Sequence, residues 1–431
     1  MCWSCWNRLL LLFLFLSKAD MKPSQIALAY GNTFIDLKIP QDTTILKIKE
    51  PLIRVSKKRF IQGLDDILPA GPIYGSIAIV VADKTRLCGY EYALEWLMEG
   101  LGLRQVKQEQ VHFYIAYGTH ARQSDEECLH AYGDSYKKYQ FIHHDCTTPD
   151  LFSTLGTTRK GTLIRVRKDI LATDVLITFG AVSHHYFAGY GGGRKLLFPG
   201  LGEKQAIYHN HSLFLDRNTR RLSTDCQPGN LDNNPVSDDL YEVHTNLPHY
   251  ISIHGILTST GKVATFSFGT SYADFLQVCA ELDQYYRVEQ RSQYGLVIAS
   301  GGGFPKDINF IQLHKAIHNS ARFVKNGGTL IVAGECKDKV GSTTLLPYFD
   351  MGSYEEAFSH LVHNYAGNGG TALALMEKTR RIRIKLLTSL DDGIVQHLGM
   401  EKISLAEIQA LLTSNRGKHT IALIANGALQ I

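Results

Sequence analysis

The chain lacks the marks of several large protein classes. Its 431 residues carry a formal net charge of only +4, and no basic stripe with interleaved aromatic residues is present, so nothing indicates nucleic-acid binding. Its eight cysteines show no zinc-finger or zinc-ribbon spacing. Those beyond residue 20 are widely scattered, which favours reduced thiols over a disulfide framework. There is no internal repeat and no low-complexity tract. Small molecules are therefore the expected partners.

Long apolar runs are also missing, apart from one near the N-terminus. The run at residues 9–16 is too short to span a bilayer as a helix. It could be the core of a secretory signal, but Met21 offers another start just before the globular pattern begins. We interpret residues 1–20 as a leader or a mis-called upstream start and favour the second. Cys2-x-x-Cys5 is then incidental. We expect a cytoplasmic protein without membrane association, with export through this segment as the alternative.

Short β-branched or aromatic runs recur along the rest of the chain, with Gly, Ser or Asp close behind. This pattern is typical of buried parallel strands. The expected strands cover residues 77–81, 112–116, 175–179, 296–299, 329–332, 382–387 and 421–424. Helical patterns lie between several of them; for example, Ser124 and Glu127 form a capping box ahead of a helix that Gly133 closes. The alternation predicts an α/β fold.

The length and the pattern near residue 280 predict two α/β domains. Residues 251–270 look like antiparallel strands and residues 272–286 like a connecting helix, and a new strand starts at Gly295. We therefore expect an N-terminal domain over residues 21–280 and a C-terminal domain over residues 281–431.

The segment from Ser183 to Lys195 carries the most chemistry. It follows an expected strand and joins two adjacent histidines, a glycine-rich loop and a lysine. Catalytic groups gather on loops held by rigid strands, and glycines let backbone approach a ligand closely. Lys195 suits a covalent role, because neighbouring Arg194 disfavours its charged form. The hydroxyl that a Walker loop needs after its lysine is absent, and the dinucleotide fingerprint also fits poorly.

Other candidate residues are ambiguous when each is taken alone. Arg86 could clamp a carboxylate or phosphate, or Asp83 could simply cap a turn beside a surface arginine. His120 could be an acid or base, or a structural histidine at a strand end. Gln312 and Lys315 share a helix face that could reach a substrate carboxylate or be merely solvated.

Four histidines invite a metal interpretation, namely His184, His185, His209 and His211. Imidazoles suit nickel, copper or zinc, and their spacing cannot choose among these metals. Ordinary surface histidines are the alternative.

Together these motifs resemble the nickel-pincer lactate racemase family. The residues that carry the resemblance are Asp83-x-Thr85-Arg86, Gly118-Thr119-His120, His185 to Gly189, Gly192 to Lys195, Pro199-Gly200, Asn210-His211-Ser212, Gly229-Asn230-Leu231, and Gly303-Phe304-Pro305 through Gln312-x-x-Lys315. They occur in family order from Met21 to near residue 330. The resemblance implies an N-terminal domain that anchors a cofactor, a C-terminal domain that closes over it, and an active site in the interdomain cleft.

The resemblance also implies a cofactor, a pyridinium mononucleotide whose two sulfur-bearing acyl groups hold nickel. Lys195 would carry it through a thioamide bond, and His211 would supply the remaining nickel ligand, a set of soft sulfur and imidazole that suits nickel. The other residues expected to bind this cofactor are Asp83, Thr85, Gly189, Tyr190, Gly192, Gly193 and Arg194. The enzymes that build the cofactor would be partners.

The implied reaction is racemisation or epimerisation of a 2-hydroxy acid. One imidazole removes the hydroxyl proton while hydride leaves the α-carbon, and return of hydride to the other face inverts the centre. His120 and His185 match the family's pair of bases, and Arg86, Gln312 and Lys315 match positions that hold substrate. The alternatives are a nicotinamide- or zinc-dependent oxidoreductase or hydrolase that uses the same histidines, and a non-catalytic protein that binds a small acid or the cofactor.

The chain departs from the lactate-specific pattern at several positions. Lys84 and Leu87 stand where lactate-specific members carry His and Pro, and no tryptophan occurs near residues 367–371. These departures argue against lactate itself and leave the 2-hydroxy acid class. His184 adjoins His185 and could compete for its role.

Overall fold

The structure is a computed structural model that describes residues 25–288, 292–415, 420–429 and 431. The interpretations of residues 1–20 and of Cys2-x-x-Cys5 lie outside the described residues. Within the described ranges, no helix combines the length and the apolar character that a membrane span requires. The six cysteines of this part of the chain are all free, as the sequence predicts.

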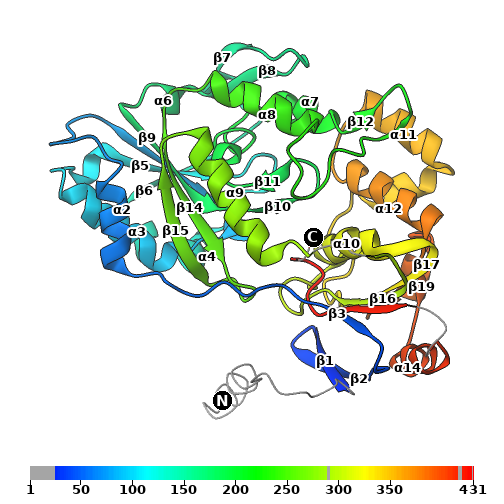
Figure 1. Ribbon diagram of the computed structural model, residues 1–431. Helices are drawn as coiled ribbons and strands as arrows, with labels where there is room; N and C mark the ends of the chain where they lie inside the picture. The colour runs from blue at the N-terminus through cyan, green and yellow to red at the C-terminus, as the bar shows by residue number, and fades with distance from the viewer. Residues whose placement is uncertain (1–24, 289–291, 416–419, 430) are drawn as a thin grey trace.

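Two six-stranded sheets, rich in parallel pairs, form the framework (Figure 1). The first has the order β15-β14-β9-β4-β5-β6, and only its β14–β15 pair is antiparallel. The second has the order β19-β18-β17-β16-β20-β3 and is parallel throughout. The strands of the two sheets are β3 (Thr44–Leu46), β4 (Ile77–Ala82), β5 (Val111–Ala116), β6 (Gln140–His143), β9 (Val175–Ala181), β14 (Ile251–Leu257), β15 (Val263–Gly269), β16 (Tyr294–Ser300), β17 (Val324–Ala333), β18 (Arg383–Leu387), β19 (Glu401–Lys402) and β20 (Ile421–Ile424).

Helices connect the strands and cover the sheets, and four two-stranded ribbons complete the described structure. The helices are α2 (Lys57–Asp65), α3 (Tyr90–Gly102), α4 (Asp125–Tyr132), α5 (Ser135–Lys138), α6 (Lys168–Leu171), α7 (Lys204–Ser212), α8 (Pro235–Thr245), α9 (Tyr272–Tyr286), α10 (Phe310–Ser320), α11 (Tyr354–His363), α12 (Gly369–Arg381), α13 (Asp392–His397) and α14 (Leu405–Ser414). The ribbons are β1–β2 (Gln25–Tyr30, Thr33–Lys38), β7–β8 (Phe152–Thr157, Leu163–Arg167), β10–β11 (Ser183–His185, Gly189–Gly191) and β12–β13 (Leu215–Asp216, Arg221–Leu222). The predicted α/β fold is confirmed.

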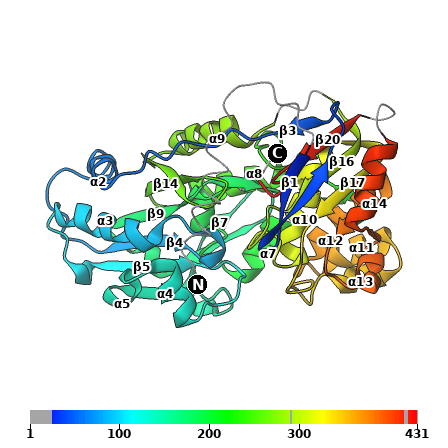
Figure 2. The ribbon, with the colours of Figure 1, turned by 90° about the horizontal axis from the view of Figure 1, so that it is seen from below.

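The first described segment lies with the second sheet, although it precedes the first sheet in sequence. β3 pairs with β20 in parallel, and Leu28 and Leu37 of the β1–β2 ribbon pack with Ile298 and Ile331 of the second sheet. Figures 1 and 2 show this blue segment beside the yellow and red strands. The division of the chain into two domains at residue 280 remains a prediction. β3 lies in the predicted N-terminal domain by its residue numbers but belongs to the second sheet, whose other strands all follow residue 280.

The first sheet positions the candidate site, because its central strand β4 is wholly apolar and buried. All six residues of β4 are buried, so neither face of this strand can carry a polar group. The polar candidate residues lie just beyond the carboxyl ends of β4, β5 and β9, at Asp83, His120 and His185. Since these strands run parallel, their carboxyl ends lie along one edge, where open α/β sheets bind ligands.

Candidate functional site

Asp83 is the first polar residue after β4, and it is only 2% exposed. It caps the short 3-10 turn η1 (Lys84–Arg86), because Oδ1 accepts hydrogen bonds from the Thr85 amide at 2.9 Å and from the Thr85 hydroxyl at 2.5 Å. The guanidinium of Arg86 donates to the same hydroxyl at 3.0 Å. The capping role considered from the sequence is therefore real, but it uses only one carboxylate oxygen.

The other oxygen of Asp83 orients His120, which follows β5. Oδ2 lies 2.6 Å from Nδ1 of His120. Burial would raise the pKa of Asp83, but the hydrogen bond and charge of His120, the charge of Arg86 and the hydrogen bond from Thr85 outweigh it and lower that pKa to about 2. An ionised carboxylate can only accept, so Nδ1 of His120 carries a hydrogen, and in the neutral ring Nε2 keeps the lone pair. This arrangement prepares His120 to accept a proton.

The β10–β11 ribbon separates the two adjacent histidines. Successive side chains of a strand point to opposite faces, and His184 turns to α9, where its Nε2 lies 2.7 Å from Asp283. Tyr190 lies opposite His184 on the ribbon and donates its hydroxyl to Asp283 at 2.9 Å. His184 therefore does not compete with His185, and the side chain of Tyr190 is held on the face of His184.

His185 lies on the other face and is held by backbone amides. Its Nδ1 accepts hydrogen bonds from the amides of Phe187 at 3.3 Å and Ala188 at 3.1 Å. Burial lowers its pKa well below the usual value, and the charges of Lys195 and Arg86 lower it further. The neutral ring must then carry its hydrogen on Nε2, which lies 3.4 Å from Nζ of Lys195. His185 thus presents an N–H where His120 presents a lone pair.

Lys195 has the properties of a nucleophilic amine. Its pKa is lowered to about 7, because burial penalises the ammonium and because Arg86 and Arg194 repel it. Arg194 itself is 2% exposed, with its guanidinium held by the hydroxyls of Tyr272 at 3.1 Å and Ser237 at 2.9 Å. The buried Arg194 side chain thus affects Lys195 through its charge and not through a direct hydrogen bond.

The backbone conformation and the packing of the loop already require glycine at positions 189, 192 and 193. Gly189, Gly192 and Gly193 have φ values of 74°, 79° and 51°, which only glycine adopts readily. A Cβ on Gly189 would lie 2.3 Å from the carbonyl oxygen of Asn230, and one on Gly192 would lie 2.4 Å from that of Ala181. Close packing within the chain therefore requires these glycines, and their contact with a cofactor stays a prediction.

His211 lies in the last turn of α7 and has the form of a single metal ligand. Its Nδ1 donates to the carbonyl of Ile207 at 2.8 Å, which leaves Nε2 as a free donor atom, as in metal sites whose second ring nitrogen is held by a carbonyl. Burial and the charge of Lys195 lower its pKa to about 3. His209 points instead to the Thr162 hydroxyl, at 3.0 Å.

No group of three or more His, Cys, Asp or Glu side chains is placed to hold a metal ion anywhere in the ranges that the structure describes. The four histidines considered as a metal cluster are thus dispersed. A metal at His211 would need most of its ligands from another molecule.

The second sheet contributes α10, which begins beyond the carboxyl end of β16. Nζ of Lys315 donates to the side-chain oxygen of Gln312 at 2.7 Å. Burial and the charge of Arg86 lower the pKa of Lys315 to about 8, against Asp83, which raises it. The predicted pair on one helix face is therefore present, and it lies within electrostatic reach of the residues that follow β4.

Tyr186 is a neighbour of this cluster that the sequence interpretation missed. Its ring stacks on His185 with centroids 5.1 Å apart, and its edges meet His314 at 5.7 Å and His318 at 5.9 Å, both on α10. It therefore joins the ribbon of His185 to the helix of Lys315. A signal existed, because it directly follows His185, but only the fold brings α10 to it.

The structure thus assembles most of the predicted residues in one region. Mutual effects on pKa and direct hydrogen bonds connect Asp83, Thr85, Arg86, His120, His185, Lys195, His211, Gln312 and Lys315. The side chains of Tyr190 and Arg194 lie behind this region and support it.

Comparisons with known proteins show what the chain is similar to. A model of the lactate racemase N-terminal domain matches residues 30–223. Two proteins named lactate racemase are each 27% identical to the chain. The one from Thermoanaerobacterium thermosaccharolyticum matches over 275 residues, 64% of this chain and 63% of that protein. The one from Lactiplantibacillus plantarum matches over 270 residues, 62% and 61% respectively. The matched region is therefore less than two thirds of the length of these relatives.

Solved structures extend the likeness of fold to nearly the whole chain. The lactate racemase apoprotein from T. thermosaccharolyticum superposes with a TM-score of 0.82 at 23% identity, over 94% of this chain and 99% of that one. A protein from Thermotoga maritima superposes with a TM-score of 0.63 at 14% identity, over 88% and 98%. At these identities the likeness concerns the fold.

Proposed function

Because the chain belongs to the lactate racemase family, we propose that it is a racemase or epimerase of a 2-hydroxy acid. The observation that carries the proposal is that two imidazoles of the same cluster are held in opposite hydrogen-bonded states, and one of them lies beside an amine. His120 offers a lone pair, His185 offers an N–H, and Lys195 lies 3.4 Å from the second. Inversion at a hydroxyl-bearing carbon needs both a proton acceptor and a proton donor.

The residues present fit the cofactor that the family resemblance implies. The pKa of about 7 leaves much of the Lys195 amine neutral at physiological pH, as attachment through a thioamide bond requires. His211 would supply one imidazole nitrogen to nickel, with the sulfur and carbon ligands coming from the cofactor. When bound, this nickel-pincer nucleotide would accept hydride from the α-carbon of the substrate and return it.

The two histidines divide the proton chemistry. Nε2 of His120 takes the proton of the substrate hydroxyl as hydride leaves the α-carbon, and Asp83 stabilises the imidazolium that forms. The product of this step is a planar 2-oxo acid. His185 presents its N–H to the carbonyl oxygen. As hydride returns to the other face, His185 gives the oxygen a proton, and for this it must first take up a proton on Nδ1, which opens its contacts with the two backbone amides. After this transfer His185 is neutral with a lone pair on Nε2, and His120 holds the proton taken from the substrate. For the opposite enantiomer the two rings exchange roles.

Arg86, Gln312 and Lys315 hold the substrate carboxylate in this proposal. Arg86 and Lys315 are close enough for Arg86 to lower the pKa of Lys315, and a shared anion would relieve that repulsion. Because clamped reactants gain rate from orientation, these anchors should affect kcat as well as KM. Lys84 and Leu87 depart from the lactate-specific pattern, and no tryptophan occurs near residues 367–371. These departures support a 2-hydroxy acid other than lactate as the substrate.

The deciding experiment is co-production of the chain with the enzymes that build the cofactor. The purified protein is then analysed for nickel and for a mass increase localised to Lys195, and a panel of single-enantiomer 2-hydroxy acids is followed by chiral chromatography. Lys195→Ala should carry no adduct, whereas Lys204→Ala, a nearby lysine outside the cluster, should keep it. A nickel-loaded protein that inverts no acid in the panel, or a loaded Lys195→Ala variant, would contradict the proposal.

A further inference from the structure

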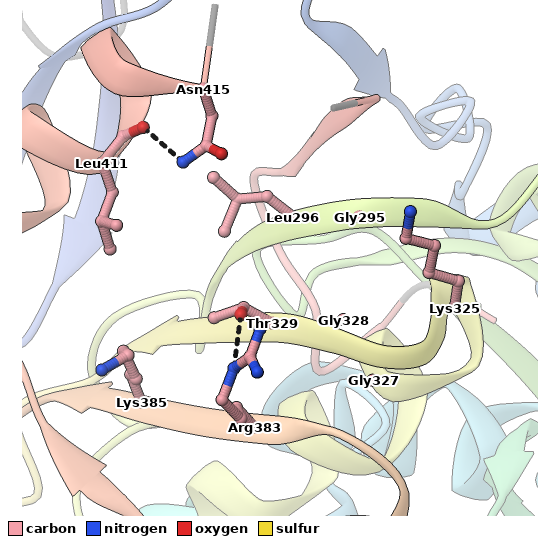
Figure 3. A pocket seen from close by; sticks show the side chains of 10 residues that line it. All are labelled: Gly295, Leu296, Lys325, Gly327, Gly328, Thr329, Arg383, Lys385, Leu411 and Asn415. Atoms are coloured by element: carbon pink, nitrogen blue, oxygen red, sulfur yellow. Dashed lines mark hydrogen bonds between the residues drawn. The ribbon is translucent and has the colours of Figure 1, made fainter. Parts of the chain in front are cut away.

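A cavity of about 270 Å³ lies at the amino ends of β16, β17 and β18, beside the end of α14 (Figure 3). The residues of the candidate site on this half belong to α10, which follows the carboxyl end of β16. The cavity is therefore at the opposite edge of the second sheet, and the proposed reaction does not use it.

Its lining is basic, and no Asp or Glu belongs to it. Lys325, Arg383 and Lys385 contribute three positive charges from two strands. Lys385 is neutralised by an ion pair with Glu401. Within the described part of the chain, neither Lys325 nor Arg383 has an ion-pair partner. Two cations therefore face one small space without compensation.

The guanidinium of Arg383 is oriented by one hydrogen bond to the protein and keeps other donors for a ligand. Its Nε donates to the Thr329 hydroxyl at 3.4 Å, so its two terminal nitrogens remain available in a planar fork that matches oxyanions. Figure 3 shows this side chain beside Thr329, with Lys325 on another side of the cavity. Between them β17 is irregular in its pairing with β16, and Gly327 of this stretch, whose φ is 72°, has open space where a Cβ would stand, so a ligand can approach the backbone.

We propose that this cavity binds a phosphate group, either as free phosphate or as the end of a small phosphomonoester. Two uncompensated cations match a dianion better than a carboxylate, and the volume admits only a small ligand. Leu296 and Leu411 form an apolar side that would contact the carbon skeleton of a phosphomonoester.

The test uses the whole chain without cofactor or substrate, so its outcome is separate from that of the racemase proposal. Calorimetric titrations at constant ionic strength compare inorganic phosphate, glycerol phosphate and acetate. Saturable phosphate binding should weaken by about tenfold or more in Arg383→Gln and in Lys325→Gln. It should be unchanged in Lys337→Gln, an exposed lysine beyond the carboxyl end of β17. Tighter binding of glycerol phosphate than of phosphate would identify the ester as the ligand, and equal or weaker binding would identify free phosphate.

Three outcomes would overturn the site. The first is the absence of saturable phosphate binding. The second is acetate binding as tight as phosphate. The third is phosphate binding that Arg86→Gln removes and Arg383→Gln leaves intact, because the anion would then occupy the cluster around Lys195. Circular dichroism of each variant checks that the fold is kept.

Discussion

Asp83 and His120 are joined by a hydrogen bond of 2.6 Å although they stand 37 residues apart in the sequence. The bond exists because β4 and β5 are neighbouring parallel strands, so that the residues just beyond their ends meet. It fixes which nitrogen of His120 carries the hydrogen. Asp83 therefore sets the reactivity of His120, although the sequence alone suggests only that Asp83 caps a turn.

Replacing this carboxylate tests the relationship. Asp83→Asn keeps the shape of the side chain but removes the charge that holds the hydrogen on Nδ1 and stabilises an imidazolium. We expect kcat of the loaded enzyme to fall by about 10²- to 10⁴-fold, with the Lys195 adduct retained. Long-range ¹⁵N NMR of the unloaded protein should show that His120 loses its preference for the Nδ1–H form. Unchanged turnover in Asp83→Asn would remove the carboxylate from the mechanism.

The amine of Lys195 should titrate near neutrality in the unloaded protein. Since its pKa is lowered to about 7, the reactive neutral form should rise through pH 7 and be nearly complete by about pH 8. Pulse acylation at graded pH, followed by peptide mass spectrometry, measures this against the exposed Lys337 as an internal control. Arg86→Gln removes one repelling charge and should move the midpoint of Lys195 upward. A midpoint near 10 in the native chain would refute the activated amine.

Most of the fold could be predicted, because most of its strands are short β-branched or aromatic runs that can be recognised in the sequence. The seven expected runs all became strands of the two sheets, the helix at residues 272–286 became α9, and Ser124 caps α4 with a full capping box. The short strands β3 and β19 gave no such signal, since two or three residues carry no period. The pairing of β3 with β20 depends on tertiary contacts between the two ends of the chain.

The candidate site was predicted less completely, because residue types reveal chemistry but not orientation. His184 and His185 are equivalent in sequence, and only the alternation of the ribbon assigns one to Asp283 and the other to Lys195. Likewise, Tyr190 and Arg194 lie inside the motif, but their side chains face Asp283 and Tyr272. Roles in binding the cofactor for these two side chains remain predictions.

The ring of His185 should be neutral, with its hydrogen on Nε2, because Nδ1 accepts from two backbone amides. Its pKa is lowered well below the usual value by burial and by the charge of Lys195. We therefore expect ¹⁵N NMR of the unloaded protein to show the Nε2–H form across the neutral range, without a titration between about pH 6 and 8. The exposed His209 serves as a comparison. An Nδ1–H form, or an imidazolium at pH 7, would contradict the assignment of a neutral ring with its hydrogen on Nε2.

Retention of bound nickel should depend on His211. Its Nε2 is the free donor atom, because Nδ1 is bonded to Ile207, and the described residues offer no protein cluster that could replace it. In His211→Ala the thioamide on Lys195 should form as before, since that bond does not involve the imidazole. Nickel retained after dialysis against a chelator should nevertheless fall by at least about tenfold. His209→Ala is the matched control on the same helix and should keep both adduct and nickel. Equal nickel retention in the two variants would show that the metal does not depend on His211, and would place its protein ligand elsewhere.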